Sequence, residues 1–170
     1  MEINFKKSLA WVRVSEGGND DDPHDPGGRT SRGITQREYN AYCQMAGLPQ
    51  GDVWKAPDPV VDDIYHKSYW LPYCPTMPAG VDYVFFDVCV NAGPGRAART
   101  LQQGLGVADD GHIGMVTSAA LSKADPKVLI NTMSDKRLAF YRALPGYRFY
   151  GKGWNSRVAF ARENALTLLT

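Results

Sequence analysis

The sequence predicts an all-α protein, and three observations support that prediction. Apolar residues recur at helical spacing in most segments, as Phe5, Leu9 and Val12 do in the first. Asp58-Pro59 and Asp125-Pro126 each place a capping residue before a proline, which is a common start of a helix. With 170 residues, of which 44% are hydrophobic and 22% charged, the chain suits one globular domain with a substantial core.

The first third of the chain is expected to hold two helices separated by a loop. The first helix runs to about Ser15, and Glu16-Gly17-Gly18 breaks it. Residues 19–33 are rich in aspartate, proline and glycine, which indicates a loop. Thr35-Gln36-Arg37-Glu38 is a capping box with Thr35 at the N-cap, and Gly47 ends the helix that follows.

The middle of the chain contains one clear helix and one ambiguous segment. A helix capped by Asp58 is expected to run toward Trp70 and to end at Pro72. Residues 81–92 are apolar on every side. Their β-branched and aromatic residues favour a strand, whereas their length favours a buried helix. We expect a buried helix because the neighbouring segments are helical.

Three more helices are expected in the second half, around a turn at Asp109-Asp110-Gly111. They are predicted at residues 97–105, from Asp125-Pro126 to Pro145-Gly146, and over residues 154–168. Two prolines and a glycine between residues 75 and 80 favour a boundary there. We therefore expect one region at 1–78 and a helical region at 79–170, packed together as one globular unit.

Charge is distributed unevenly although the net charge is only +1. Residues 1–125 hold eleven Lys and Arg against sixteen Asp and Glu, whereas residues 126–170 hold eight against two. The basic positions of this second segment are Lys127, Lys136, Arg137, Arg142, Arg148, Lys152, Arg157 and Arg162. Such a segment indicates an anionic partner, or else the solvated faces of helices. We expect no nucleic-acid partner, because no recognition-helix or base-stacking motif is present.

The cysteines and histidines give no pattern of a metal or disulfide site. Cys43, Cys74 and Cys89 are widely spaced and odd in number, so buried free thiols are expected. The run of aspartates from Asp20 lacks the glutamate that an EF-hand needs at loop position 12, where Ser31 stands. We expect no metal and no cofactor.

One carboxylate is placed for acid catalysis. Glu16 follows the first helical pattern at its negative end, with Trp11 and Val12 in the preceding turn. Both surroundings disfavour the charged form, and glycoside cleavage needs an acid that keeps its proton. Asp25 follows nine residues later, and a hairpin-like excursion would bring it opposite Glu16, as the carboxylate pair of glycoside hydrolysis requires. A solvated turn with a capping aspartate would show the same spacing.

These residues closely resemble the signature of glycoside hydrolase family 108. That family comprises lysozyme-like N-acetylmuramidases of phage endolysins and of bacterial secretion or release activators. The matching segments, without a gap, are Glu16-Gly17-Gly18, Asp22-Pro23-His24-Asp25-Pro26-Gly27-Gly28-Arg29-Thr30 and Gly33-Ile34-Thr35. Residues 86–93, 101–103, 110–114 and 152–158 resemble the predicted peptidoglycan-binding region that accompanies the family. Asn19, where an aromatic is frequent, and Met115, where proline is common, depart from the pattern.

The resemblance implies a lysozyme-like fold with two lobes around a substrate cleft. Glu16 would be the catalytic acid, and Asp25 with Thr30 would orient water or stabilise the oxocarbenium-like centre. Ser31 and Thr35 are alternatives to Thr30. The candidate substrate-binding residues are Thr35, Asp87, Asn91 and Tyr150. Asp87 and Asn91 equally suit helix capping or a core hydrogen bond, and Trp154 is expected in the core.

These features predict a peptidoglycan hydrolase, an endolysin-like lysozyme that cleaves the β-1,4 bond between N-acetylmuramic acid and N-acetylglucosamine as a monomer. A non-catalytic peptidoglycan-binding or secretion-assisting protein is the alternative. No apolar stretch typical of a signal peptide surrounds Lys6 and Lys7. We therefore expect synthesis in the cytoplasm and holin-type or other release to the periplasmic wall. The basic C-terminal segment is expected to engage an anionic membrane or wall surface.

Overall fold

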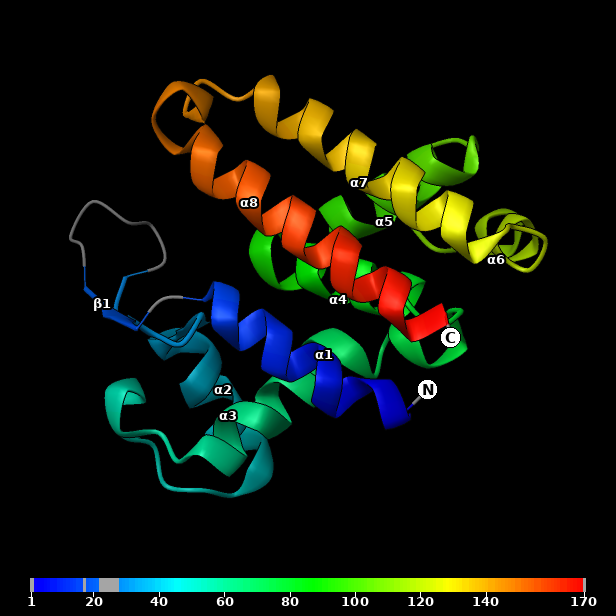
Figure 1. The fold of residues 1–170 in the computed structure, drawn as a ribbon. Coiled ribbons are helices and arrows are strands. Elements are labelled where there is room, and N and C mark those ends of the chain that lie inside the picture. The colour runs from blue at the N-terminus through cyan, green and yellow to red at the C-terminus, as the bar shows by residue number, and fades with distance from the viewer. Residues whose placement is uncertain (1, 17, 22–27, 170) are drawn as a thin grey trace. The chain divides into compact units, whose positions relative to one another are not determined.

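The computed structural model describes residues 2–16, 18–21 and 28–169, which are mostly helical, as predicted (Figure 1). The α-helices are α1 (Glu2–Ser15), α2 (Gln36–Ala46), α3 (Asp58–Ile64), α4 (Val81–Ala92), α5 (Pro94–Leu105), α6 (Met115–Leu121), α7 (Pro126–Arg142) and α8 (Tyr147–Leu166). Short 3₁₀ turns are η1 (Val53–Lys55), η3 (Cys74–Thr76) and η4 (Thr167–Leu169), and η2 (Tyr65–Trp70) is π-helical. No described helix is long and apolar enough to cross a membrane.

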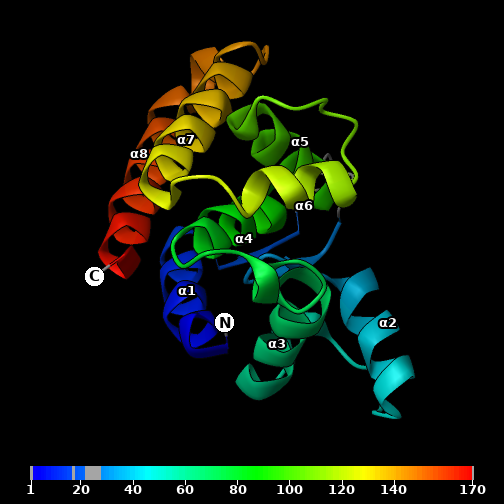
Figure 2. The same ribbon diagram turned by 90° about the vertical axis from the view of Figure 1, so that its right-hand side faces the viewer.

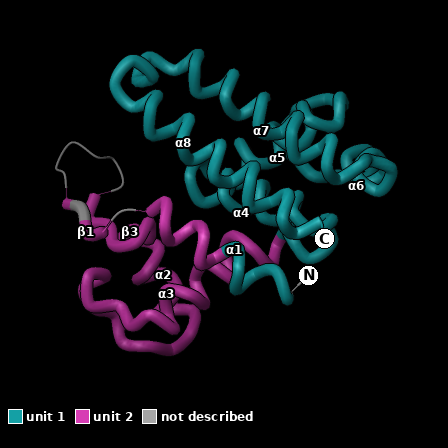
Figure 3. Tube along the Cα trace, viewed as in Figure 1, with its two compact units in different colours: residues 1–8, 73–170 teal, residues 9–72 magenta. Residues whose placement is uncertain are grey.

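The chain forms two compact units (Figure 3). Residues 9–72 make the N-terminal unit, and residues 1–8 with 73–170 make the helical unit. The division therefore falls before residue 78, and the first residues of α1 join the second unit. Asn4 explains this, because its Nδ2 donates a hydrogen bond of 2.8 Å to Asp82 in α4. The Phe5 ring also packs edge-on against Phe86, with centroids 6.0 Å apart.

The N-terminal unit contains a small antiparallel sheet where a loop was expected. Strand β1 (Asn19–Asp20) pairs with β2 (Thr30–Ser31), and β2 pairs with β3 (Ile34–Thr35). The prediction of an irregular loop over 19–33 was therefore wrong in part. Each strand has only two residues, so no alternation of apolar and polar residues could reveal it.

The helix boundaries of this unit follow local capping chemistry. The capping box of Thr35 and Glu38 is confirmed, and Gly47 ends α2 at a φ of 66°. The expected N-cap at Asp58 is wrong by one residue, because Pro57 takes that position. The Asp58 carboxylate instead binds the guanidinium of Arg32, which leaves it unable to cap α3.

The helical unit is built around α4, which confirms the buried helix predicted for 81–92. Residues 81–89 are all buried, and α7 and α8 lie side by side in both views (Figures 1 and 2). Asp125 caps α7 by accepting a hydrogen bond of 2.9 Å from the Val128 amide, as predicted. Helix α6 was not predicted, because it is only seven residues long and buries only Thr117 and Leu121. Cys43, Cys74 and Cys89 are buried free thiols, as expected.

Candidate active site

Glu16 closes the last turn of α1. Its amide donates a hydrogen bond of 3.0 Å to the carbonyl of Val12, a fully buried residue. The carboxyl group therefore lies at the helix end where unpaired carbonyls concentrate negative potential, as the sequence predicted. Its Oε1 is shielded from solvent although the residue as a whole is only half-buried. Position and shielding together give the setting expected of a catalytic acid.

The tight turn between β2 and β3 lies directly against the Glu16 carboxyl. Arg32 and Gly33 are its central residues, with φ angles of 51° and 77°, which is the type I′ geometry of two-residue hairpins. A Cβ atom on Gly33 would lie 2.7 Å from Glu16 Oε2 and 2.6 Å from the Tyr65 hydroxyl. Only glycine satisfies both the left-handed backbone and this close approach.

Tyr65 is a site residue that sequence reasoning missed. It is fully buried at the start of η2, and its hydroxyl donates a hydrogen bond of 2.5 Å to the Arg32 carbonyl. The Tyr65 hydroxyl and the Glu16 carboxyl thus border the same face of Gly33. In the sequence Tyr65 was one apolar position of a helix, and nothing in that pattern distinguished it from a core aromatic.

The paired strands form the stem of the predicted hairpin excursion. Asn19 pairs with Ser31 and Asp20 with Thr30, so the chain after Glu16 returns beside its own start. Asp25 lies outside the described residues, and its role stays a prediction. Thr30 follows on β2, where its hydroxyl donates a hydrogen bond of 2.9 Å to the Gly28 carbonyl. The Thr30 oxygen keeps lone pairs with which it can accept a hydrogen bond from water.

The two alternatives to Thr30 are less available. The Thr35 hydroxyl takes part in the capping box, where it lies 2.8 Å from Glu38 Oε2 and accepts from the Glu38 amide. Ser31 is buried, and its Oγ accepts a hydrogen bond of 3.3 Å from Arg32. Thr30 and Thr35 are both half-exposed, and what separates them is that the Thr35 hydroxyl is engaged with Glu38. The substrate-binding role assigned to Thr35 stays a prediction.

An aromatic side chain that the sequence did not single out is held beside Thr30. The Trp54 indole donates a hydrogen bond of 3.1 Å to the Thr30 carbonyl and remains 37% exposed. The Arg29 guanidinium lies 3.7 Å from the Trp54 ring centroid, and Asp52 binds the same guanidinium at 2.8 Å. Trp54 thus places an aromatic ring beside the hairpin, although Asn19 stands at the position where an aromatic residue was expected.

In the helical unit, Asp87 is the centre of a buried charged network. It is fully buried on α4, and Arg137 of α7 and Arg157 of α8 bind its two oxygens at 2.5 and 2.9 Å. Burial by itself raises the pKa of the Asp87 carboxyl, but the two arginines hold that pKa below its ordinary value. Of the two alternatives left open for Asp87, the structure shows the core interaction, and substrate binding stays a prediction.

Arg137 corrects one expectation about the basic segment. The sequence counted it among the exposed cations, but only 1% of it is exposed, because Asp87 neutralises it inside the unit. An amphipathic pattern cannot distinguish a buried paired arginine from a solvated one. Lys136, Arg142 and Arg148 are exposed and remain as surface charges.

Asn91 and Tyr150 are linked by a row of aromatic side chains. Asn91 is exposed, and its Oδ1 accepts hydrogen bonds from the Tyr141 hydroxyl and, at 3.4 Å, from Arg137. The Tyr141 ring packs on Trp154 at 5.1 Å, and Trp154 packs on Tyr150 at 5.8 Å. These contacts join two candidate substrate-binding residues of the helical unit through the buried Tyr141 ring. Trp154, which was expected in the core, is half-buried.

No cluster of three or more metal-ligating side chains occurs among residues 2–16, 18–21 and 28–169. The described site presents the Glu16 carboxyl group, the Thr30 hydroxyl and the Trp54 ring.

Comparison with known proteins assigns both halves of the chain. The family model for glycosyl hydrolase 108 matches residues 9–93, and the model for a predicted peptidoglycan domain matches residues 96–159. Among solved structures the chain is similar to Brucella abortus SagA, with 36% sequence identity and a TM-score of 0.84. That match covers 99% of this chain and 97% of the SagA chain. The search of curated proteins found no match.

The close approach at Gly33 predicts a large and specific cost for an added methyl group. Gly33→Ala is expected to destabilise the protein well beyond the roughly 1–2 kcal/mol of a left-handed backbone, because its Cβ meets Glu16 and Tyr65. Gly47→Ala is the matched control, since Gly47 has a similar φ of 66° with nothing within 4 Å of the added atom. Urea unfolding measures both changes. Equal losses for the two variants would contradict the contact, and adding Glu16→Ala should recover part of the Gly33→Ala loss.

The buried network predicts that Asp87 contributes to stability in a pH-dependent way. Asp87→Asn removes the buried carboxylate that Arg137 and Arg157 both bind and should cost about 3–5 kcal/mol, whereas Asp135→Asn, at an exposed pair with Arg162, should cost less than about 1 kcal/mol. The pKa of Asp87 is lowered in the folded state, so its contribution is complete above the unfolded value of about 3.9 and is lost as pH falls through the lower folded value. Denaturant titrations from pH 7 to pH 2.5 should show the wild-type advantage over Asp87→Asn shrinking only at the acid end. An advantage that is constant with pH would count against the ion pairs.

Proposed function

Because the chain belongs to the glycosyl hydrolase 108 family, we propose that it is a muramidase with Glu16 as its general acid. It cleaves the β-1,4 bond between N-acetylmuramic acid and N-acetylglucosamine in peptidoglycan. The peptidoglycan domain and the likeness to SagA support a lytic or binding role at peptidoglycan. The observation that carries the catalytic proposal is the placement of Glu16 at the end of α1, against Gly33.

The proposed reaction begins with proton transfer from Glu16 to the glycosidic oxygen. A carboxyl group at the carbonyl end of a helix suits a proton donor, since its anion would face the negative end of the dipole. Such a donor contributes roughly 100- to 10,000-fold to the rate. The leaving sugar takes the proton, and an oxocarbenium-like centre develops at the anomeric carbon.

Water completes the reaction in this proposal. Asp25, as the second carboxylate, removes a proton from water while the Thr30 oxygen accepts a hydrogen bond from the same molecule. Water attack on the face opposite the leaving group would invert the anomeric configuration, which requires the two carboxyl groups to lie about 6.5–9.5 Å apart. NMR of the first product anomer tests inversion against retention.

The biological setting follows from the substrate. We propose an endolysin-like enzyme that acts as a monomer on the cell wall after release from the cytoplasm. Its exposed basic residues Lys136 and Arg142 would draw it toward the anionic wall or an adjoining membrane surface.

Replacing the acid should abolish cleavage and preserve the fold. Glu16→Gln keeps size and polarity but cannot donate a proton as a carboxylic acid does, so release of reducing ends from purified sacculi should fall at least 100-fold. Glu163→Gln, an exposed glutamate of α8, is the matched control and should retain full activity. Muropeptide analysis identifies the new reducing end, which should be muramic acid.

Other outcomes of the same assay would decide between enzyme and binding protein. Wild-type-like lysis by Glu16→Gln would remove this residue from the mechanism. If the unaltered chain binds sacculi and releases no product, the alternative of a non-catalytic wall-binding protein holds.

The surface charge predicts a difference between large and small substrates. Lys136→Gln combined with Arg142→Gln should slow lysis of intact sacculi several-fold at low salt, with a smaller effect at high salt, because the attraction is screened. Cleavage of short soluble fragments should change by less than twofold. The control pair Lys55→Gln and Lys123→Gln makes the same change in net charge at exposed positions elsewhere. Equal effects on both substrates, or of both pairs, would refute a local role.

A further inference from the structure

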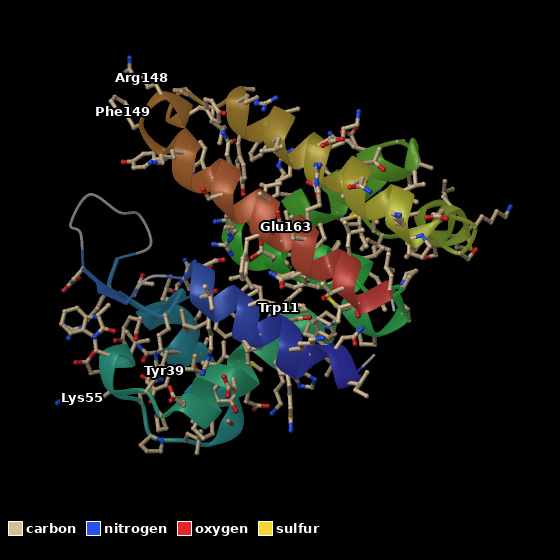
Figure 4. The ribbon with its side chains drawn as sticks, in the orientation of Figure 1. Trp11, Tyr39, Lys55, Arg148, Phe149 and Glu163 are labelled. Atoms are coloured by element: carbon tan, nitrogen blue, oxygen red, sulfur yellow. The ribbon has the colours of Figure 1, made fainter. Side chains whose placement is uncertain are left out.

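The turn between α7 and α8 exposes aromatic side chains that the proposed chemistry at Glu16 does not use. Phe149 is 70% exposed and Tyr150 is 63% exposed, and both lie in the first turn of α8. Figure 4 shows Phe149 and Arg148 projecting outward from this end of the helix. We call Tyr147, Phe149, Tyr150 and Trp154 the aromatic tip. Adjacent exposed aromatic rings are unusual on a surface without a partner and indicate a binding site.

The rings of the tip form a continuous and supported surface. Tyr150 packs on Trp154 at 5.8 Å, Tyr147 packs on Trp154 at 6.3 Å, and Phe149 meets Tyr150 at 6.3 Å. Trp154 in turn packs on buried Tyr141. The outermost rings therefore rest on the core of the unit, so a ligand that stacks on them would meet a surface already formed.

The charged residues in the sequence that carries the tip are all basic. Arg148 lies over the Phe149 ring, with its guanidinium carbon 4.5 Å from the centroid. A hydrogen bond from Asn155, and then the nearby Arg142, lower the pKa of the Tyr147 hydroxyl. No acidic residue occurs in the sequence between Asp135 and Glu163. The ligand that fits this surface combines faces that stack on aromatic rings with carboxylate groups.

Two kinds of surface carry anionic groups beside apolar ones, namely peptidoglycan and a bilayer with anionic lipids. Peptidoglycan is favoured, because the peptidoglycan domain model spans 96–159 and includes the whole tip. The row of rings also leads through Tyr141 to the exposed Asn91, whose amide NH₂ is a donor that suits an acetamido or lactyl oxygen. Rings of tyrosine and tryptophan suit sugars because they combine an apolar face with a polar edge.

We propose that the aromatic tip is a docking surface for peptidoglycan strands, with Phe149 and Tyr150 stacked on sugar rings and Arg148 paired with stem-peptide carboxylates. This inference rests on the proposed function and adds to it a contact surface on the helical unit. It explains why the two most exposed aromatic side chains of that unit are adjacent.

Binding without cleavage tests the tip directly. In the full chain carrying Glu16→Gln, Phe149→Ser with Tyr150→Ser should raise the half-saturation concentration for purified sacculi about tenfold, as expected when central aromatic anchors are lost. Met115→Ser with Val116→Ser is the matched control, because these apolar residues are 90% and 71% exposed at the start of α6. Tyr150→Phe keeps the ring and should keep the affinity. Urea midpoints should be unchanged in all of them, since the altered side chains are exposed.

Two further ligands identify what the tip binds. Arg148→Gln should weaken binding to intact sacculi but not to chitin oligosaccharides, whose N-acetylglucosamine rings can stack but carry no carboxylate. Vesicles of phosphatidylethanolamine and phosphatidylglycerol test the lipid alternative. The proposal is overturned if the double serine variant binds sacculi like its parent, if the parent itself does not bind sacculi, or if only vesicle binding is lost.

The result is separable from the catalytic proposal. Reducing-end release by the chain with native Glu16 reports on catalysis alone. Release together with tip variants that bind normally refutes the tip and leaves the muramidase intact. Absence of release together with a tenfold loss of binding refutes the muramidase and leaves the tip as the surface of a binding protein.

Discussion

The N-terminal unit is organised around a contact that only glycine allows. Glu16 must end α1 with its carboxyl group against the backbone of Gly33, in a turn whose two central residues both have positive φ. Arg32 adopts its unfavourable conformation because its guanidinium binds the Ala56 carbonyl at 2.7 Å and the Asp58 carboxylate. The Tyr65 hydroxyl donates a hydrogen bond to the Arg32 carbonyl. Helix end, turn and π-helical segment therefore fix one another, and this backbone geometry places the Glu16 carboxyl group against Gly33.

The helical unit has a buried charged residue, Asp87, at its centre. Asp87 has lost all contact with solvent, and two arginines from separate helices restore the favourable interactions that water would have supplied. The ion pairs cross from α4 to α7 and to α8, so they fix which residues of those helices face the core. The large positive excess of the C-terminal sequence is thereby divided. Arg137 and Arg157 pair with Asp87 inside the unit. Lys136, Arg142 and Arg148 lie on the surface, where they can attract an anionic polymer.

The sequence predicted what depends on local chemistry. The capping box at Thr35, the cap at Asp125 and the buried helix over 81–92 follow from residues within a few positions of one another. The three short strands could not be predicted, because two residues carry no period. Tyr65 and Trp54 were missed for another reason, since their importance comes from contacts with Arg32 and Thr30, which lie 33 and 24 positions away. Glu16 was identified from its place after the first helical pattern and from the family resemblance, and only the fold shows what surrounds its carboxyl group.

The buried network also bears on surface residues that it does not touch. Arg157 is eight residues beyond Phe149 on α8, a separation of about 12 Å along the helix axis. Because Arg157 and Arg137 are both bound to Asp87, α7 and α8 cannot rotate or slide independently near that point. Tyr141 extends this restraint to the aromatic tip. Its hydroxyl donates a hydrogen bond to Asn91 of α4, and its ring packs against Trp154 of α8. A rigid row of rings loses little conformational freedom on binding, which is the condition under which exposed aromatic side chains bind a flexible polymer most effectively.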